Sequence, residues 1–237
     1  MFKNVLNVVQ YFFEATNFMD NESLARPHRE ELRDALLAAA TRTIAERGHQ
    51  ALRARELAAE VGCSVGSIYN VFPDIDALIL AVKAQTLDRL EAEVQRRLGA
   101  FSPGSAAEAR DRFLALAKVY IDFAHDNWRL WSSAFEHSSP NSSALDDYMH
   151  RLDAILANIE GPLAALLPEL AERPRRLLAS GLFGSVHGIV TLGLDQKLGT
   201  ISLDELGWQV ETVFAATLRG LTRPDEIGRS PLVTAEA

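Results

Sequence analysis

The sequence predicts an all-α protein with a small three-helix N-terminal domain and a larger C-terminal helical bundle. Apolar residues recur at helical spacing along most of the 237 residues, and a glycine ends each of the first two helices. No stretch alternates apolar and polar residues as a half-buried strand does. We expect domains over residues 26–90 and 91–221, with an N-terminal extension over 1–25 and a tail over 222–237.

The first two helices follow from the spacing of their apolar residues. The helix over residues 29–47 places leucine, alanine and isoleucine side chains on one face, and Gly48 ends it. A shorter helix over residues 55–61 ends at Gly62 in the same way. Ser64 then stands where its hydroxyl can cap a third helix.

The remaining helices are longer. Asp74 is placed to cap a helix over residues 75–98, which belongs to both domains and is therefore the expected lever between them. Beyond a break at Gly99 and Ser102–Ser105, helices are expected near residues 105–126, 128–136, 142–160, 174–198 and 204–220. The separators include Gly161-Pro162, because proline removes a helical hydrogen bond.

The composition fits a protein with a large core in a reducing compartment. Hydrophobic residues make up 48% of the chain, but no uninterrupted apolar run reaches the roughly 18 residues that span a membrane. We therefore expect no membrane partner. Cys63 is the single cysteine, so an intrachain disulfide is impossible and a cytoplasmic location is expected.

The acidic net charge lies mostly outside the N-terminal domain. The chain carries −8 overall, yet residues 26–90 hold nine basic and nine acidic residues, while residues 91–237 hold 14 and 20. The total therefore does not exclude nucleic-acid binding; it removes long-range steering by the whole molecule.

Residues 1–18 are apolar and aromatic, with one lysine and no small-residue cleavage site. They make a poor secretory signal. An accessory helix and an artefact of an upstream start codon are both open readings of this segment.

The stretch VGCSVGSIYNVF, residues 61–72, has the form of a helix-turn-helix. At about 100° per residue, a helix that buries Ile68 also turns Phe72 and Ser64 inward. The outward positions are Gly66, Ser67, Tyr69 and Asn70. Small and hydrogen-bonding residues of this kind suit a major groove, and glycine permits close backbone approach.

These residues resemble the DNA-binding domain of the TetR/AcrR family of bacterial repressors, over residues 29–90. The family's glycine, serine, glycine, tyrosine and phenylalanine pattern is matched by Gly62, Ser64, Gly66, Tyr69 and Phe72. The family often has a lysine where this chain has Val65, a threonine where it has Arg53, and a lysine where it has Ile75.

The resemblance implies double-stranded operator DNA as a partner. The expected DNA-binding residues are Arg53, Arg55, Ser64, Val65, Gly66, Ser67, Tyr69 and Asn70. Tyr69 would contact a phosphate and Asn70 the bases, whereas Val65 could instead pack partly in the core. A basic arm of Arg26, His28, Arg29 and Arg33 is a further candidate for backbone or minor-groove contact.

The C-terminal domain suggests a homodimer. Small residues recur at Gly181, Gly184, Ser185 and Gly188, which allows another helix to come close. The resemblance implies that the last two helices pair with those of a second copy, and two reading heads about 34–36 Å apart suit a palindrome. His187-Gly188 is similar to a C-terminal subtype named for Trp-His-Gly, with Phe183 in place of the tryptophan.

A small apolar or aromatic effector is expected in the same domain. The candidate pocket residues are Trp128, Trp131, Phe135, His137, Tyr148, Phe183 and His187. Aromatic walls with a few polar groups fit such a ligand, although the same residues could be plain core.

Enzymatic chemistry has no recognisable motif. The acidic and histidine residues around Glu136-His137 and Asp147 lack metal-ligand spacing, and no nucleophile-elbow, Walker or dinucleotide pattern occurs. We therefore expect no metal, no cofactor and no enzyme. The expected function is a repressor released from operator DNA by a small molecule; an activator or an effector-independent DNA binder is the alternative, and an enzyme or carrier is the least favoured.

Overall fold

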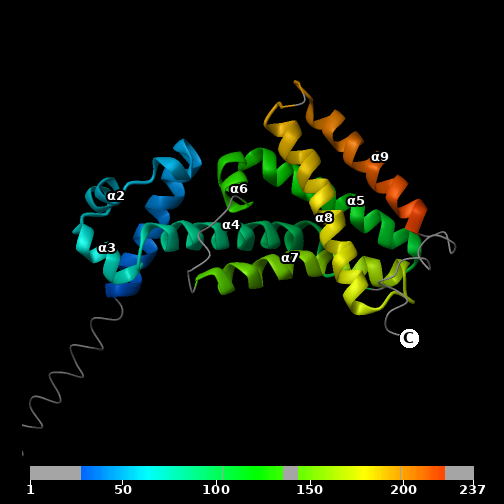
Figure 1. The fold of residues 1–237 in the computed structure, drawn as a ribbon, viewed down its shortest axis with the longest axis horizontal. Helices are drawn as coiled ribbons and strands as arrows, with labels where there is room; N and C mark the ends of the chain where they lie inside the picture. Colours follow the sequence, from blue (N-terminus) through cyan, green and yellow to red (C-terminus); the bar gives the residue numbers. More distant parts are fainter. Residues whose placement is uncertain (1–27, 103, 136–143, 198, 222–237) are drawn as a thin grey trace, which may run out of the picture. The chain divides into compact units, whose positions relative to one another are not determined.

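The computed structural model describes residues 28–102, 104–135, 144–197 and 199–221, and the extension, the tail and His137 lie outside them. Within this described part the chain is helical and contains no strand, which confirms the all-α prediction. The chain divides into one unit that ends at Ile79 and another that begins at Leu80 (Figure 1). The division falls inside α4 (Ile75–Leu98), so it precedes the expected boundary at residue 90 without any loop to mark it.

The first unit holds a helix over residues 28–47, the short 3-10 turn η1 (His49–Ala51), α2 (Ala54–Val61) and α3 (Val65–Val71). Gly48 and Gly62 have φ angles of 80° and 76°, the left-handed region in which glycine alone is unstrained. Both therefore end their helices as predicted. The core of this unit consists of buried side chains that include Leu36, Ile44, Leu57, Ile68 and Phe72.

Two predicted caps are present. Ser64 Oγ accepts a hydrogen bond from the Ser67 backbone N–H at 3.0 Å and so begins α3. Asp74 Oδ1 accepts one from the Ala77 N–H at 2.6 Å and so begins α4.

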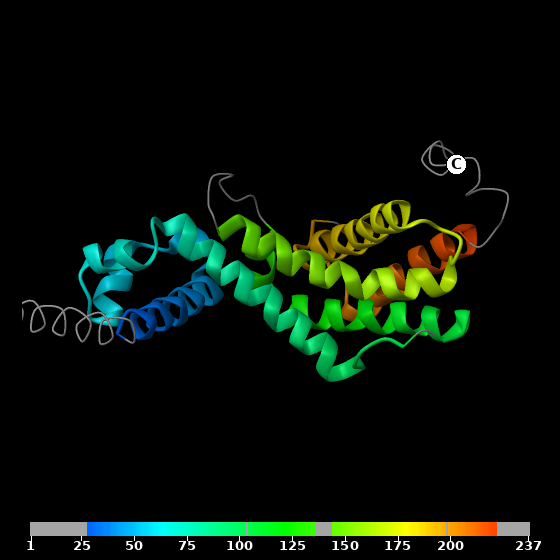
Figure 2. The same ribbon diagram turned by 90° about the horizontal axis from the view of Figure 1, so that it is seen from below.

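In its described residues, the second unit contains the rest of α4 and five further helices. These are α5 (Ala106–Asp126), α6 (Trp128–Phe135), α7 (Ala144–Leu166), α8 (Glu172–Leu194) and α9 (Leu203–Leu221). Helix α5 packs against α6, α7, α8 and α9, and Figure 2 shows α7 and α5 running alongside each other. The core of the second unit contains aromatic and aliphatic side chains from all these helices. Trp131, Leu163 and Leu206 are almost wholly buried in it.

The prediction that Gly161-Pro162 separates two helices is wrong. Pro162 lies inside α7, which continues to Leu166. Pro162 is buried, and the next residue, Leu163, is fully buried in the core. Tertiary packing therefore outweighs the hydrogen bond that proline cannot donate.

Helix α8 carries glycines of two kinds. A Cβ at Gly193 would lie 2.6 Å from Leu206 Cδ1, so this glycine lets α9 approach. Among the described residues, a Cβ at Gly181, Gly184 or Gly188 would meet no atom within 4 Å. By length and composition α8 could span a membrane, as could the bent pair α3 and α4, but helices of water-soluble proteins pass the same test.

Candidate nucleic-acid interface and ligand cavity

Helix α3 buries one face and exposes the other, as the sequence predicts. Ile68 is fully buried and Phe72 nearly so, whereas Gly66 and Asn70 are exposed and the Tyr69 side chain is 46% exposed. Val65 and Ser67 are half-buried.

The polar groups of α3 differ in how free they are. The Ser64 and Ser67 hydroxyls lie 2.8 Å apart and share a hydrogen bond. Within the described residues, the side chains of Tyr69 and Asn70 make no hydrogen bond. Tyr69 and Asn70 are therefore the side chains of α3 with donors and acceptors available to an external partner.

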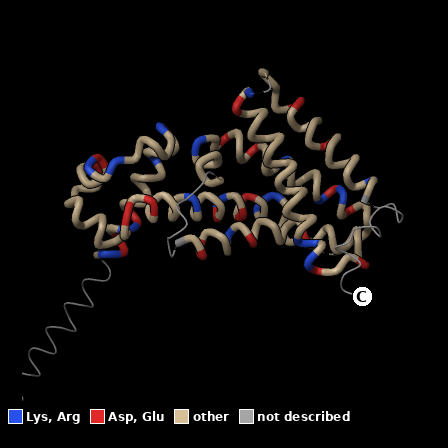
Figure 3. Tube along the Cα trace, viewed as in Figure 1, with Lys and Arg blue, Asp and Glu red and all other residues tan. Residues whose placement is uncertain are grey.

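Positive charge stands beside α3, not on it. In Figure 3, α3 has no blue (Lys, Arg) or red (Asp, Glu) residue, in agreement with its sequence VGSIYNV. Arg53, at the start of α2, donates from Nη1 to the carbonyls of Gln50 and Leu52 at 2.7 and 2.9 Å. Arg55 is exposed and makes no hydrogen bond or ion pair in the described part of the chain. Arg55 thus has a fully available guanidinium near the turn.

Two arginines of the proposed basic arm have intrachain partners. Arg29 Nη2 donates to the Asn70 carbonyl at 3.0 Å, and the Arg33 guanidinium lies 5.2 Å from the centre of the Phe72 ring. Both contacts hold the C-terminal end of α3 against the first helix. Sequence reasoning missed this role, because no local pattern links residues 41 positions apart.

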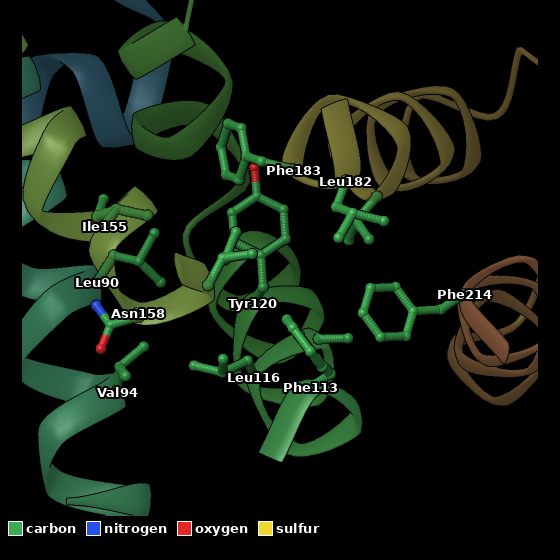
Figure 4. A pocket seen from close by; sticks show the side chains of 13 residues that line it. Leu90, Val94, Phe113, Leu116, Tyr120, Ile155, Asn158, Leu182, Phe183 and Phe214 are labelled. Carbon is green, nitrogen blue, oxygen red and sulfur yellow. The ribbon is translucent and has the colours of Figure 1, made fainter. Parts of the chain in front are cut away.

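The second unit contains a cavity of about 60 Å³ (Figure 4). Side chains from α4, α5, α7, α8 and α9 line it, and they are apolar except for Tyr120 and Asn158. Phe113 and Phe214, which face each other with ring centres 4.8 Å apart, close one part of the wall. The arrangement can hold an apolar group and offers it very few polar contacts.

An aromatic cluster adjoins the cavity at Tyr120. The rings of Trp131, Phe135, Phe183 and His187 pack around one another and Tyr120, with neighbouring centres 4.6 to 6.4 Å apart. Tyr120 Oη lies 2.7 Å from His187 Nδ1, and His187 Nε2 lies 3.3 Å from Thr191 Oγ1. Burial lowers the pKa of His187 and raises that of Tyr120, so a neutral imidazole accepts from the Tyr120 hydroxyl.

The expected pocket residues are brought only partly together around the cavity. Phe183 lines it, whereas Trp131, Phe135 and His187 belong to the adjoining aromatic cluster. Trp128 stacks on Trp131, and Tyr148 Oη donates to the Ala134 carbonyl at 2.8 Å. Their part in ligand binding stays a prediction.

Asn158 is a cavity residue that sequence reasoning missed. Its Nδ2 donates to Glu91 Oε2 on α4 at 2.6 Å and to the Ala154 carbonyl at 3.2 Å. An amide that lies in sequence between Ile155 and Ile159, on an otherwise apolar helix face, was the available signal.

In the part of the chain that the structure describes, no three His, Cys, Asp or Glu side chains gather as metal ligands would. Cys63 is half-buried and unpaired with another cysteine.

Comparison with family models gives two matches. Residues 36–82 match the model described as "Bacterial regulatory proteins, tetR family". Residues 113–221 match one described as "Tetracyclin repressor-like, C-terminal domain". Together the two matches cover more than half of the chain. The second description does not mention the Trp-His-Gly subtype, which stays a prediction.

Solved structures share the fold over most of the chain. A Rhodococcus sp. RHA1 protein of unknown function is 28% identical, with a TM-score of 0.59, and the match covers 80% of this chain and 94% of that one. A TetR-family transcriptional regulator from Bordetella parapertussis 12822 is 18% identical, with a TM-score of 0.54 and coverage of 78% and 94%.

A third similar structure contains a ligand. It is the transcriptional regulator FadR from Bacillus subtilis in complex with stearoyl-CoA, 16% identical, with a TM-score of 0.58 and coverage of 76% and 95%. Among curated proteins, none matches the chain significantly.

Proposed function

Because this chain belongs to the TetR family of DNA-binding transcriptional regulators, we propose that it is a cytoplasmic, homodimeric repressor that a small molecule releases from operator DNA. The observation that carries the proposal is the exposed face of α3, where Tyr69 and Asn70 have no side-chain hydrogen bond in the described chain. A regulator needs such a face because bases and phosphates must supply the missing partners.

The proposed DNA contacts divide by chemistry. Tyr69 and Arg55 contact phosphates, and Asn70 reads a base edge in the major groove. Gly66 lets the α3 backbone come close, while Ser64 and Ser67 act mainly by seating the helix, because their hydroxyls bond to each other. Arg53 and Val65 contribute at the margin of this face.

The open glycines of α8 support the proposed homodimer. Nothing in the described chain approaches the positions above Gly181, Gly184 and Gly188, so intrachain packing does not require these glycines. A helix from a second copy would use the space. Exposed apolar side chains on α9, Val213 at 45% and Trp208 at 66%, extend the apolar surface available to that copy.

The cavity supports the proposed effector site. Its wall is almost entirely apolar and includes Leu90 and Val94 of α4, the helix shared by both units. The same fold in B. subtilis FadR is described with stearoyl-CoA, a ligand that carries a long acyl chain. An effector releases DNA only if it binds the DNA-incompetent state more tightly, which requires that its binding site involve an element able to move.

A gel shift with DNA from the chain's own promoter region, at low salt, tests the proposal. Wild-type protein should bind, and Tyr69→Phe should weaken binding by about fivefold per half-site for every sequence alike, the usual effect of one hydrogen bond. Tyr148→Phe makes the same chemical change in the other unit, where the hydroxyl meets Ala134, and should leave DNA binding unchanged. Absence of wild-type binding would count decisively against a DNA-binding regulator.

Activation in place of repression is the second candidate. A reporter gene under the same promoter separates the two, because loss of the protein raises transcription for a repressor and lowers it for an activator.

A further inference from the structure

Asn158 gives the cavity wall a hydrogen-bonding group whose partner lies on another helix. Figure 4 shows its amide among Leu90, Val94 and Ile155. The Nδ2 group donates at 2.6 Å to Glu91, the residue that follows Leu90 on α4. The Asn158 side chain therefore lines the cavity and also makes the hydrogen bond that joins α7 to α4.

The cavity must enlarge to accept a ligand. Its volume of about 60 Å³ is well below the roughly 300–1,000 Å³ of sites for drug-sized molecules. Helices α5, α7, α8 and α9 form the closely packed pairs of this unit, and α4 is not among them. The α4 wall is thus held mainly by side-chain contacts such as those of Leu87 and Leu90, and we expect this wall to move first.

Two polar contacts hold the α4 wall against α7. Besides Glu91–Asn158, Asp88 of α4 pairs with Arg151 of α7 at 2.8 Å. The Asp88–Arg151 pair is largely exposed and contributes little to stability. The Glu91–Asn158 bond is partly buried and ends on a charged acceptor, which strengthens it, and Asn158 also lines the cavity.

Helix α7 is also weakened at this turn. Pro162 has no N–H to donate to the Asn158 carbonyl four residues earlier. The backbone that carries Asn158 can therefore adjust without breaking a hydrogen bond at that position.

From these contacts, and resting on the proposed function of the cavity, we infer its ligand class and its switch. The geometry points to an uncharged, largely apolar molecule with one carbonyl-type acceptor. The ligand acceptor replaces Glu91 as the acceptor of the hydrogen bond that Asn158 Nδ2 donates. Helix α4, no longer held by this bond, then moves away and makes room for the apolar part of the ligand.

Charge favours a neutral ligand over an anion. A ligand carboxylate at Asn158 Nδ2 would compete with the Glu91 carboxylate for one donor, and the two negative charges would repel. Arg112 interacts with the Glu91 charge but donates its terminal nitrogens to the carbonyls of Leu98 and Gly99. Its Nε is buried and has no hydrogen-bond partner among the described residues, so an anionic probe is included in the experiment.

Three nine-carbon probes separate these chemistries in calorimetric titrations of the full-length chain: methyl heptyl ketone, nonane and nonanoate. The ketone should bind most tightly, because nonane cannot bond to Asn158 and nonanoate meets Glu91. Hydrogen exchange of the α4 amides should accelerate with the ketone and not with nonane.

Two variants predict changes of opposite sign. Asn158→Leu should weaken ketone binding about fivefold and leave nonane binding unchanged. Glu91→Gln keeps the shape but removes the charge that holds the amide, so ketone binding should strengthen about threefold. Asn127→Leu is the matched control, since Asn127 bonds to Arg89 and Phe123 away from the cavity, and it should change neither value.

The inference is overturned if nonanoate binds at least as tightly as the ketone, if no probe binds, or if Asn158→Leu weakens ketone and nonane alike. Should Asn158→Leu fail to fold, an unchanged ketone affinity in Glu91→Gln overturns it on its own. None of these outcomes concerns DNA, so promoter binding in the gel shift keeps failure of the ligand class distinct from failure of the regulatory function.

Discussion

Tyr69 and Asn70 are adjacent on α3 and both exposed, yet their chemistry assigns them different work. A phenol hydroxyl bonds to any phosphate, because every nucleotide carries one. A carboxamide can donate to and accept from one base edge, and asparagine pairs well with adenine in the major groove. Affinity is therefore expected from the first residue and sequence preference from the second.

Replacing Asn70 with alanine should relax sequence preference at one position in each half of the operator. Discrimination there should fall by about 1–3 kcal/mol, while affinity for non-specific DNA stays nearly constant. Binding to a library of operators mutated one base at a time measures this. Tyr69→Phe, which should lower all affinities together, is the comparison, and an unchanged preference profile in Asn70→Ala would show that α3 presents another residue to the bases.

His187 makes folding stability depend on pH. Burial lowers its folded-state pKa below the ordinary value of about 6.5, so the unfolded chain binds a proton more readily. The contribution is fully present above about pH 6.5 and is lost as the pH falls towards the folded pKa. Protonation would also place an N–H against the Tyr120 hydroxyl.

Urea unfolding at about pH 7.5 and pH 5.5 tests this effect, with His187→Gln expected to lose less stability on acidification than the wild type. The control is His125→Gln, since His125 is exposed and contacts the adjacent Asp126. Equal acid sensitivity in wild type and His187→Gln would assign the pH dependence to other groups.

At the scale of elements, α3 depends on its cap. It has only seven residues and no charge, so its own propensity cannot maintain it. The Ser64 cap, the Arg29 bond to the Asn70 carbonyl and the burial of Ile68 together fix both ends and the middle. This anchoring lets a helix without lysine or arginine present its face in one orientation.

Ser64→Ala should destabilise the protein by about 1 kcal/mol and also weaken DNA binding, because α3 loses its cap and Ser67 its hydroxyl partner. Ser105→Ala removes a similar cap from α5, in the second unit, and should cost about as much stability. Thermal unfolding and gel shift on both variants check this. Equal DNA binding by the two would mean that α3 does not need its cap to read DNA.

The helices could be read from the sequence because their signals are local. Apolar spacing, Gly48 and Gly62, and the caps at Ser64 and Asp74 all act within one or two turns. The predicted helix break at Pro162 was wrong because the hydrogen bond that proline cannot donate is outweighed by packing around α7.

The contacts that shape the candidate sites could not be read in the same way. Arg29 meets Asn70, and Glu91 meets Asn158, across long stretches of chain. One sequence without structure places no constraint on such pairs.

At the scale of the whole molecule, DNA affinity is expected to depend less on charge than on the geometry of the dimer. The net charge of −8 provides no long-range attraction to DNA, and several N-terminal arginines are already engaged, such as Arg42 with Glu60 and Arg47 with Glu56. An arginine that stays in an intrachain ion pair releases no counterion on binding, so a shallow dependence of affinity on salt is expected. Useful affinity must then come from two reading heads acting together, which makes the dimer essential to the proposed function.

Gly184→Leu tests that dependence directly. Since a Cβ at Gly184 meets no atom of the described chain within 4 Å, and leucine favours a helix over glycine by up to about 1 kcal/mol, the single chain should fold at least as well as the wild type. A close helix from a second copy would be pushed away, so sedimentation should show monomer and operator affinity should fall.

Gly193→Ala is the counterpart with the opposite expectation. Its Cβ would lie 2.6 Å from Leu206 Cδ1 inside the chain, so thermal stability should drop by about 1 kcal/mol while the dimer persists among folded molecules. A Gly184→Leu protein that stays dimeric would place the interface elsewhere than on the open glycines of α8. A wild-type protein that sediments as a monomer would remove the reason for expecting a palindromic operator.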